Sequence, residues 1–267
     1  MISTLGSIKK IICISILILI VVGIVIYVND TGKFNVKYIK PKTQSYDSLY
    51  KYLRTNRSFE KITDQLNGVM LLPKDVTIIV KECNCAEFGP FYNITDSSIV
   101  IPYEFILYLY GRCNNSNIPK DKINKVVNDI LLFVLFHEMG HALHEMPGLS
   151  YVSSEYEREA LADAISVLIL INSDLGESAI NAMSYFLLSK SEKKELDYWG
   201  RHPPAEQRVF NILCLIYGSD NDKYSALTTL PQFGNDLKEQ TENCKETYQE
   251  VFNSLKEDLW QYKKPDN

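Results

Sequence analysis

The spacing of apolar residues along the chain predicts a mostly helical domain with a small sheet. Residues 76–80 (VTIIV) are a β-branched run, and residues 98–101 (SIVI) follow turn-like residues, so both are predicted strands. A helix is expected over residues 45–66, and apolar positions recur at helical spacing from residue 103 onward. Later helices are expected at about residues 103–111, 121–146, 154–172, 176–190, 203–217 and 241–262. Two or three strands beside many helices indicate an α+β fold.

A long apolar segment precedes this domain. Residues 11–28 (IICISILILIVVGIVIYV) carry no charge, and 18 residues are about the minimum for a helix that spans a bilayer. No small-residue cleavage site follows the segment, so we expect a transmembrane signal anchor rather than a cleaved signal peptide. The expected organisation is a cytoplasmic tail (1–10), a membrane helix (11–28), a polar stalk (29–45) and a domain (46–267).

The side of the membrane on which the domain lies depends on charges and cysteines. Lys9 and Lys10 favour a cytoplasmic N-terminus, whereas four lysines at positions 33–42 favour the opposite orientation. Cys214 lies in an apolar helical segment and Cys244 in a later charged one, so a disulfide between them would join two helices. Disulfides persist outside the cytosol, although free buried thiols are the alternative. We expect a single-pass membrane protein whose domain is extracytoplasmic, at the cell surface or on the periplasmic side.

Composition adds little to this picture. The chain is 46% hydrophobic and 23% charged, which is ordinary for a globular protein. Its formal net charge is −5 and no basic stripe stands out in the sequence. We therefore expect no nucleic-acid partner.

The candidate chemistry begins with an H-E-x-x-H motif that directly follows an apolar run. His137 and His141 are four residues apart on a predicted helix, so both rings can face one metal ion. Glu138 would then lie beside the ion, where it can take a proton from a metal-bound water. The alternative is a pair of core histidines with an exposed glutamate. That alternative leaves ionisable groups beside an apolar run without the partners that burial demands.

The next predicted helix offers the missing ligand. Glu159 and Asp163 are also four residues apart, so Glu159 could complete the ligand set and Asp163 could accept the free N–H of a ligand histidine. The alternative is a solvated acidic first turn that complements the helix dipole. That alternative suits Glu155 and Glu157, but Asp163 has apolar neighbours. His144 lies a turn too far along its helix to join a tetrahedral site easily.

These motifs in combination resemble those of known zinc peptidases. H-E-x-x-H followed on a second helix by E-x-x-x-D is similar to the glutamate-type zincins, the gluzincins. More closely, the chain resembles a family of uncharacterised bacterial domains of unknown function that are described as metallopeptidases. The resemblance covers roughly residues 70 to 250. It is carried by the blocks YNITDSSIVIPYEFI, FVLFHEMGHAL, EREALAD and DYWGRHPPAEQRVFNILCLIYGSD, with Cys244 beyond them.

The resemblance implies a zincin-like metallopeptidase domain that binds one Zn²⁺ and acts on a peptide or protein substrate. Carried over by position, His137, His141 and Glu159 would bind zinc and Glu138 would be the general base. The chain departs from the family where a cysteine is expected before a Tyr-Glu pair, since Pro102 stands there. With that cysteine missing, Cys83 could pair with Cys113 instead.

His202 and Arg208 belong to a segment similar to one in membrane-associated zinc peptidases with the same ligand set. There the segment lies near the active site, so the resemblance implies that His202 or Arg208 could stabilise an oxyanion. The alternative is that His202 flanks a helix N-terminus, with proline at the first helical position and Arg208 in a surface salt bridge.

The sequence as a whole favours a membrane-anchored zinc metallopeptidase in which Glu138 activates a zinc-bound water. One alternative keeps the zinc without catalysis, as a zinc-stabilised surface module for binding or scaffolding. Another is a helix pair that binds no metal. An intact Glu138 argues against the binding module, because a purely structural site has no need of a base.

Overall fold

The computed structural model describes residues 32–83, 89–146, 154–189, 205–229, 241–260 and 262–263. The expected membrane helix, Cys85 and His202 lie outside these residues. The strands are β1 (Phe34–Tyr38), β2 (Val76–Lys81), β3 (Phe91–Asn93) and β4 (Ser98–Pro102). The helices are α2 (Asp47–Thr55), α3 (Glu60–Val69), α4 (Tyr103–Asn114), α5 (Ile123–His144), α6 (Glu155–Asn172), α7 (Gly176–Ser189), α8 (Ala205–Ser219) and α10 (Thr241–Trp260). Short 3-10 turns occur at Gln44–Tyr46, Lys120–Lys122 and Ser225–Thr229.

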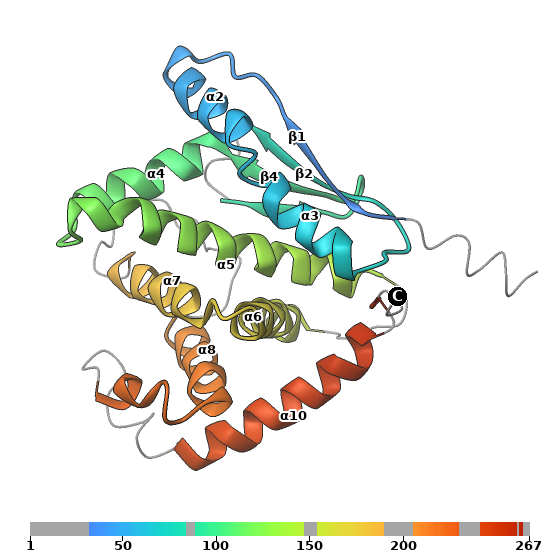
Figure 1. The fold of residues 1–267 in the computed structure, drawn as a ribbon, viewed down its shortest axis with the longest axis vertical. Helices are drawn as coiled ribbons and strands as arrows, with labels where there is room; N and C mark the ends of the chain where they lie inside the picture. Colours follow the sequence, from blue (N-terminus) through green and yellow to red (C-terminus); the bar gives the residue numbers. More distant parts are fainter. Residues whose placement is uncertain are drawn as a thin grey trace, which may run out of the picture.

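The molecule is a mostly helical α+β structure, as the apolar pattern predicted. The described residues form a four-stranded sheet in the order β1-β2-β4-β3, in which β3 alone runs antiparallel to its neighbour. In Figure 1 the sheet and α2 lie above α5, while α6, α7, α8 and α10 lie below it. Alternation on β2 puts Val76, Ile78 and Val80 in the core with no exposed surface. The two predicted strands correspond to β2 and β4.

Strand β1 is a correction to the sequence prediction, which assigned its residues to a polar stalk. It pairs in parallel with β2, with Phe34 opposite Val76. The side-chain amide of Asn67 in α3 covers its outer edge, since it accepts from Phe34 N and donates to Phe34 O, both at 2.8 Å. In β1 the apolar residues Phe34, Val36 and Tyr38 alternate with polar ones, which is a weak signal for a strand. Lysine on an edge strand discourages pairing with a further strand.

A second correction concerns the single helix expected over residues 45–66. The structure has two helices there, α2 and α3, separated by residues 56–59. Arg57 adopts φ 50°, outside the helical range. The break lets Phe59 turn inward, where it is 4% exposed and its ring centroid lies 6.4 Å from that of Tyr38. Contact with β1 therefore overrides the local helical pattern.

Helix α5 is the central element, packed against the sheet on one side and against α6 and α7 on the other. Among the described residues, Lys120–His144 is the stretch long and apolar enough to cross a membrane. However, 72% of its most apolar window is buried inside the protein, as in the core helix of a globular domain. Packing on two sides also explains why α5 lacks a narrow apolar stripe.

The cysteines connect the outer helices and correct one prediction. Cys214 of α8 and Cys244 of α10 form a disulfide. Cys83 is also disulfide-bonded, whereas Cys113 is a buried free thiol. The suggested Cys83–Cys113 pair is therefore wrong. Burial raises the pKa of the Cys113 thiol above its ordinary value.

Gly140, inside the H-E-x-x-H motif, sets how closely α5 and α6 approach. A Cβ at this position would lie 2.7 Å from the Cα of Ala162 in α6, too close for real atoms. Because that neighbour is backbone, only a shift of one helix could relieve the clash. Gly111 of α4 offers a matched contrast, since a Cβ there would have nothing within 4 Å.

We predict that Gly140→Ala lowers the free energy of unfolding by about 1–3 kcal/mol through overpacking. Gly111→Ala, also inside a helix, should raise it by about 0.5–1 kcal/mol because alanine loses less backbone entropy on folding. Urea unfolding of both variants beside the parent measures the two effects. Similar small changes in both variants would contradict the close approach of α5 and α6.

Candidate metal centre

The candidate centre forms where the C-terminal half of α5 crosses α6. Contacts between the helices fix their register: Ser166 Oγ of α6 donates to the carbonyl oxygen of Phe133 in α5 at 2.8 Å. Helix α6 starts at a capping box in which Ser154 and Glu157 bond reciprocally. Glu157 therefore serves the helix start, as the alternative interpretation of this acidic turn proposed. Glu159 and Asp163, by contrast, are buried against α5.

Three donor atoms from His137, His141 and Glu159 converge on one point. The two Nε2 atoms lie 3.2 Å apart, and Glu159 places Oε2 3.2 Å from His137 Nε2 and Oε1 3.3 Å from His141 Nε2. In tetrahedral zinc sites, with metal bonds near 2.0–2.1 Å, neighbouring ligand atoms lie about 3.3 Å apart. The spacing of the donors therefore fits one zinc ion. Within the described residues, these three side chains are the group able to hold a metal.

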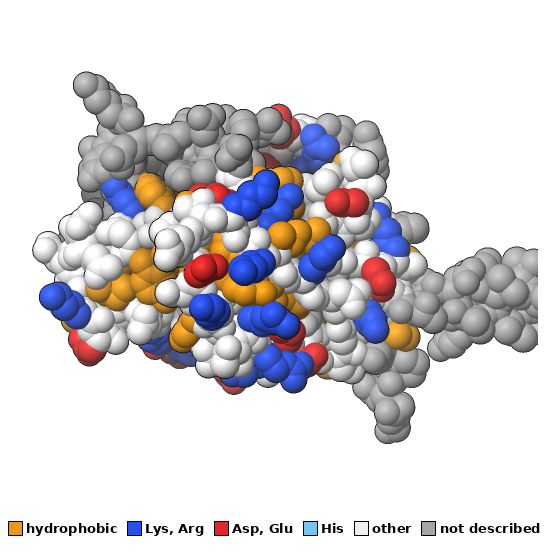
Figure 2. Space-filling view, turned by 90° about the horizontal axis from the view of Figure 1, so that it is seen from above, with side chains coloured by type: hydrophobic (Ala, Val, Ile, Leu, Met, Phe, Trp, Pro, Cys, Tyr) orange, Lys and Arg blue, Asp and Glu red, His pale blue; other side chains and the backbone are white. Residues whose placement is uncertain are grey.

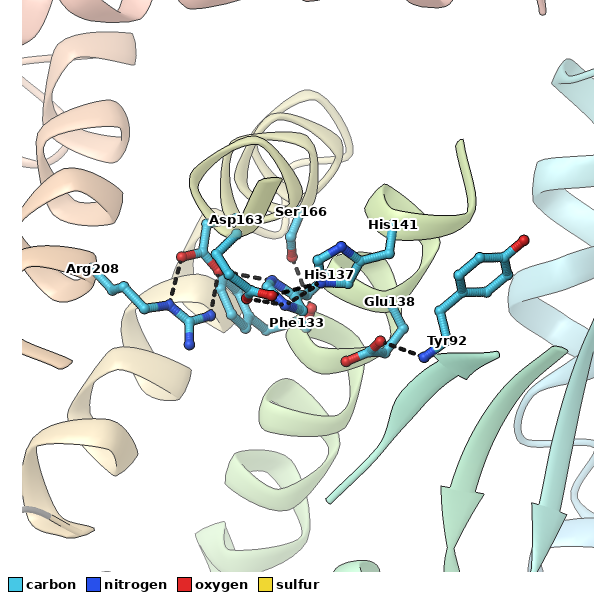
Figure 3. A network of polar contacts seen from close by, with 9 residues as sticks. Tyr92, Phe133, His137, Glu138, His141, Asp163, Ser166 and Arg208 are labelled. Carbon is cyan, nitrogen blue, oxygen red and sulfur yellow. Dashed lines mark hydrogen bonds and ion pairs between the residues drawn. The ribbon is translucent and has the colours of Figure 1, made fainter. Parts of the chain in front are cut away.

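A buried chain of polar contacts orients His137 (Figure 3). Its Nδ1 lies 2.8 Å from Asp163 Oδ1, so a proton on Nδ1 leaves the Nε2 lone pair for a metal. Arg208 of α8 donates to both oxygens of Asp163, from Nε at 2.8 Å and from Nη2 at 2.7 Å. The guanidinium is buried, with 7% of the residue exposed. The alternative of a surface salt bridge for Arg208 is therefore wrong.

These polar contacts shift the pKa values of His137 and Asp163. Burial by itself lowers the pKa of His137, but the adjacent Asp163 carboxylate raises it to about 9. Burial likewise raises the pKa of Asp163, but the Arg208 guanidinium lowers it to about 2. In the metal-free protein His137 is thus protonated at neutral pH, and a metal must displace that proton.

Glu138 lies on the side of α5 that faces the sheet, as Figure 3 shows. It is 3% exposed, and its Oε2 accepts a hydrogen bond from the backbone N–H of Tyr92 in β3 at 2.8 Å. The alternative of an exposed glutamate is therefore wrong. The contact with Tyr92 could not be predicted from the sequence, because a backbone N–H leaves no signal in the residue type. Only the position of β3 brings that donor to Glu138.

The comparisons with known proteins agree with this geometry. Residues 38–259 match the model of a domain family described as "Putative metallopeptidase". The chain belongs to this metallopeptidase family. The family is the one that the sequence blocks indicated, and its model spans nearly all described elements. No curated protein and no solved structure gives a significant match.

The two remaining histidines of this family member are His144 and His202. His144 is mostly buried, with Nδ1 3.8 Å from Glu145 Oε1, and it is not in the metal-holding group. This position agrees with the expectation that it lies a turn too far along α5. The role expected of His202 stays a prediction, since that residue lies outside the described part of the chain.

The raised pKa of His137 predicts proton-coupled zinc binding. Between its ordinary pKa of 6.5 and about 9 the folded, metal-free protein holds an extra proton on His137, so zinc affinity should fall about tenfold per pH unit below 9. The same sign predicts that this histidine stabilises the metal-free fold below pH 6.5 and loses that effect as pH rises through about 9. Calorimetry in buffers of different ionisation enthalpy counts the protons released.

Asp163→Asn provides the contrast. Loss of the carboxylate charge should reduce proton release at neutral pH and weaken zinc binding about 10- to 100-fold. Glu155→Gln, at an exposed position in the first turn of the same helix, should match the parent protein. Equal proton release from parent and Asp163→Asn would contradict the coupling between His137 and Asp163.

Proposed function

We propose that this chain is a membrane-anchored zinc peptidase of the gluzincin type. Membership of a metallopeptidase family supports hydrolysis of peptide bonds as its activity. The observation that carries the proposal is the spacing of the donor atoms of His137, His141 and Glu159, which suits a tetrahedral metal ion. Glu138 directly follows the first of these ligands in the chain. The zincin-like fold is part of the proposal, supported by the pairing of these motifs on α5 and α6.

Each residue has a distinct part in the proposed reaction. Zinc, when bound by the three ligands, supplies a Lewis acid that lowers the pKa of water and polarises a carbonyl group. Glu138 is the general base: it accepts a proton from the attacking water and later passes it to the leaving amine. The Tyr92 N–H holds one oxygen of Glu138 in place, so the carboxylate is positioned before substrate arrives. Asp163 and Arg208 keep His137 in the tautomer that binds metal.

The ligand count favours catalysis over a zinc-stabilised binding module. A structural zinc site is closed by four protein ligands, whereas a catalytic site keeps a position open. In the described part of the chain the group comprises three ligands. The buried carboxylate of Glu138 beside that group is the base that a binding module would not need.

The substrate is proposed to be an extended peptide bound along β3. This strand ends the described sheet, and its Tyr92 N–H already points to Glu138 at the candidate centre. A sheet edge can receive a peptide as an added strand through backbone hydrogen bonds. Such binding would bring a scissile bond to the base and the metal ligands.

The membrane anchor is proposed to be residues 11–28, with the domain outside the cytosol. The disulfide between Cys214 and Cys244 and the disulfide-bonded state of Cys83 support an oxidising compartment. The anchor itself rests on the apolar sequence alone.

Zinc content tests the centre directly. Purified full-length chain should carry about one zinc per molecule, measured by plasma mass spectrometry, because three preorganised ligands meet in one buried site. His137→Ala and Glu159→Ala should each lose most of that zinc. Less than about one zinc in ten parent molecules would instead support the helix pair without metal.

Glu138→Gln tests the mechanism. The amide keeps an oxygen to accept from Tyr92 N–H but cannot take a proton, so peptide hydrolysis should fall about 10²- to 10⁴-fold while zinc content is unchanged. Glu145→Gln, just beyond the end of α5, is the matched control and should retain activity. Hydrolysis of a quenched fluorescent peptide library measures both variants. Undiminished hydrolysis by Glu138→Gln would rule out its role as the base.

A further inference from the structure

The two faces of the sheet differ sharply on β1 and β2. Val76, Ile78 and Val80 point into the core and have no exposed surface. On the opposite face Lys37 and Ile39 are exposed, and Ile79 and Lys81 are half-buried. The register sets Lys37 directly opposite Ile79. A backbone hydrogen bond from the N–H of Ile39 to the carbonyl oxygen of Val80 continues the strand pairing toward Lys81. Lysine and isoleucine side chains therefore alternate across one open surface, the β1–β2 face.

The surroundings of the β1–β2 face are strongly basic. Residues 32–83 contain ten Lys or Arg and five Asp or Glu, although the whole chain carries a net charge of −5. Figure 2, which looks down on the side that carries α2 and β1, shows Lys and Arg side chains around exposed hydrophobic ones. No basic stripe was expected from the sequence, although all ten residues belong to one continuous stretch of the chain. Six of them lie on or beside β1 and β2: Lys33, Lys37, Lys40, Lys42, Lys74 and Lys81. The other four belong to α2, α3 and the turn between them, which pack on the core side of β1 through Leu53 and Phe59.

Nearby carboxylates do little to neutralise this surface. Asp75 accepts a hydrogen bond from the backbone N–H of Lys33 at 2.9 Å. Glu82 accepts hydrogen bonds from the Thr43 hydroxyl and from the backbone N–H groups of Thr43 and Lys42, which together lower its pKa and hold it against the chain just after β1. Both acidic groups thus accept hydrogen bonds from backbone donors beside this surface.

The distance along the chain places the β1–β2 face close to the proposed anchor. The apolar segment ends at Val28 and β1 begins at Phe34, so residues 29–33 are the whole connection. Five residues span at most about 17 Å when fully extended. Of the expected polar stalk (29–45), only residues 29–33 precede β1, and they are too short to hold the domain far from the membrane.

We propose that the β1–β2 face docks onto the anionic headgroups of the bilayer that holds the anchor. Lysines near an anionic leaflet each strengthen binding about fivefold, and Ile39 and Ile79 can rest at the headgroup boundary. The proposal rests on the anchoring part of the proposed function. Because β1 and β3 are opposite ends of the sheet, docking keeps the candidate metal centre turned away from the lipid.

Lysine reactivity measured by mass spectrometry tests this docking. The full chain is reconstituted into phosphatidylcholine nanodiscs and into discs with about one third phosphatidylglycerol. Acetylation of Lys37 and Lys81 should be slowed about threefold or more in the anionic discs, because headgroups shield the ammonium groups. Lys245 belongs to α10, which lies on the other side of α5 from the sheet in Figure 1, and it should react equally in both. Equal reactivity of Lys37 and Lys81 in the two kinds of disc overturns the proposal.

Charge reversal provides the matched variants. In Lys37→Glu/Lys81→Glu, protection of the neighbouring Lys33 and Lys40 should disappear, whereas Lys223→Glu/Lys245→Glu should retain it. Unchanged zinc content and peptide hydrolysis in both variants show that the fold is intact. If the full chain does not insert into phosphatidylcholine discs, it is mixed with anionic vesicles instead. Protection of Lys37 and Lys81 on those vesicles would then support docking and contradict the proposed anchor. Protection that survives Lys37→Glu/Lys81→Glu would overturn the assignment of this face.

Discussion

The buried contacts among His137, Asp163 and Arg208 are the constraint on which the candidate centre depends. A carboxylate inside a protein is costly unless a partner compensates its charge, and removal of one partner typically costs about 3–5 kcal/mol. Asp163 has two such partners, from α5 and α8, while it is itself part of α6. The three helices must therefore meet in one register. The disulfide between Cys214 and Cys244 then ties α8 to α10, so a remote helix supports the orientation of a metal ligand.

A second buried carboxylate shows the same principle on α5, two turns before His137. Asp129 accepts from Ser178 and Asn181 of α7, at 2.8 and 2.6 Å, and from Lys125 at 2.9 Å. Three buried polar residues of this apolar helix, Asp129, His137 and Glu138, thus have partners on α7, α6 and β3 respectively. This pairing lets α5 be almost wholly buried while it carries ionisable side chains. Packing around α5 consequently fixes the helices that supply the ligands.

The arrangement separates two surfaces with different proposed tasks. Strand β3 presents its edge to Glu138, while β1 and β2 carry the lysine-rich face at the other end of the sheet. Helix α5 supplies the base on its sheet side and ligands toward α6, so the candidate reaction would take place between the sheet and the helical layer (Figure 3). A short connection to the proposed anchor would hold this arrangement in a defined orientation.

Much of this protein could be predicted from its sequence, for local reasons. The strands β2 and β4 and the helices from α4 onward follow from residue periodicity, which packing preserved. The pairing of His137 with His141 and of Glu159 with Asp163 follows from the four-residue helical repeat. Prediction failed where distant contacts overrode the local pattern. The helix expected over residues 45–66 is interrupted where Phe59 packs against Tyr38. Strand β1 is held by pairing with β2 on one edge and by Asn67 on the other.

The sequence by itself determined which side chains can hold a metal and which can act as a base, because helical spacing is a local property. Only the tertiary structure decided that Arg208 is buried against Asp163 and that a backbone N–H of β3 holds Glu138. Each of these depends on elements far apart in sequence, and their meeting is set by burial and the pairing of buried charge, which no local pattern records.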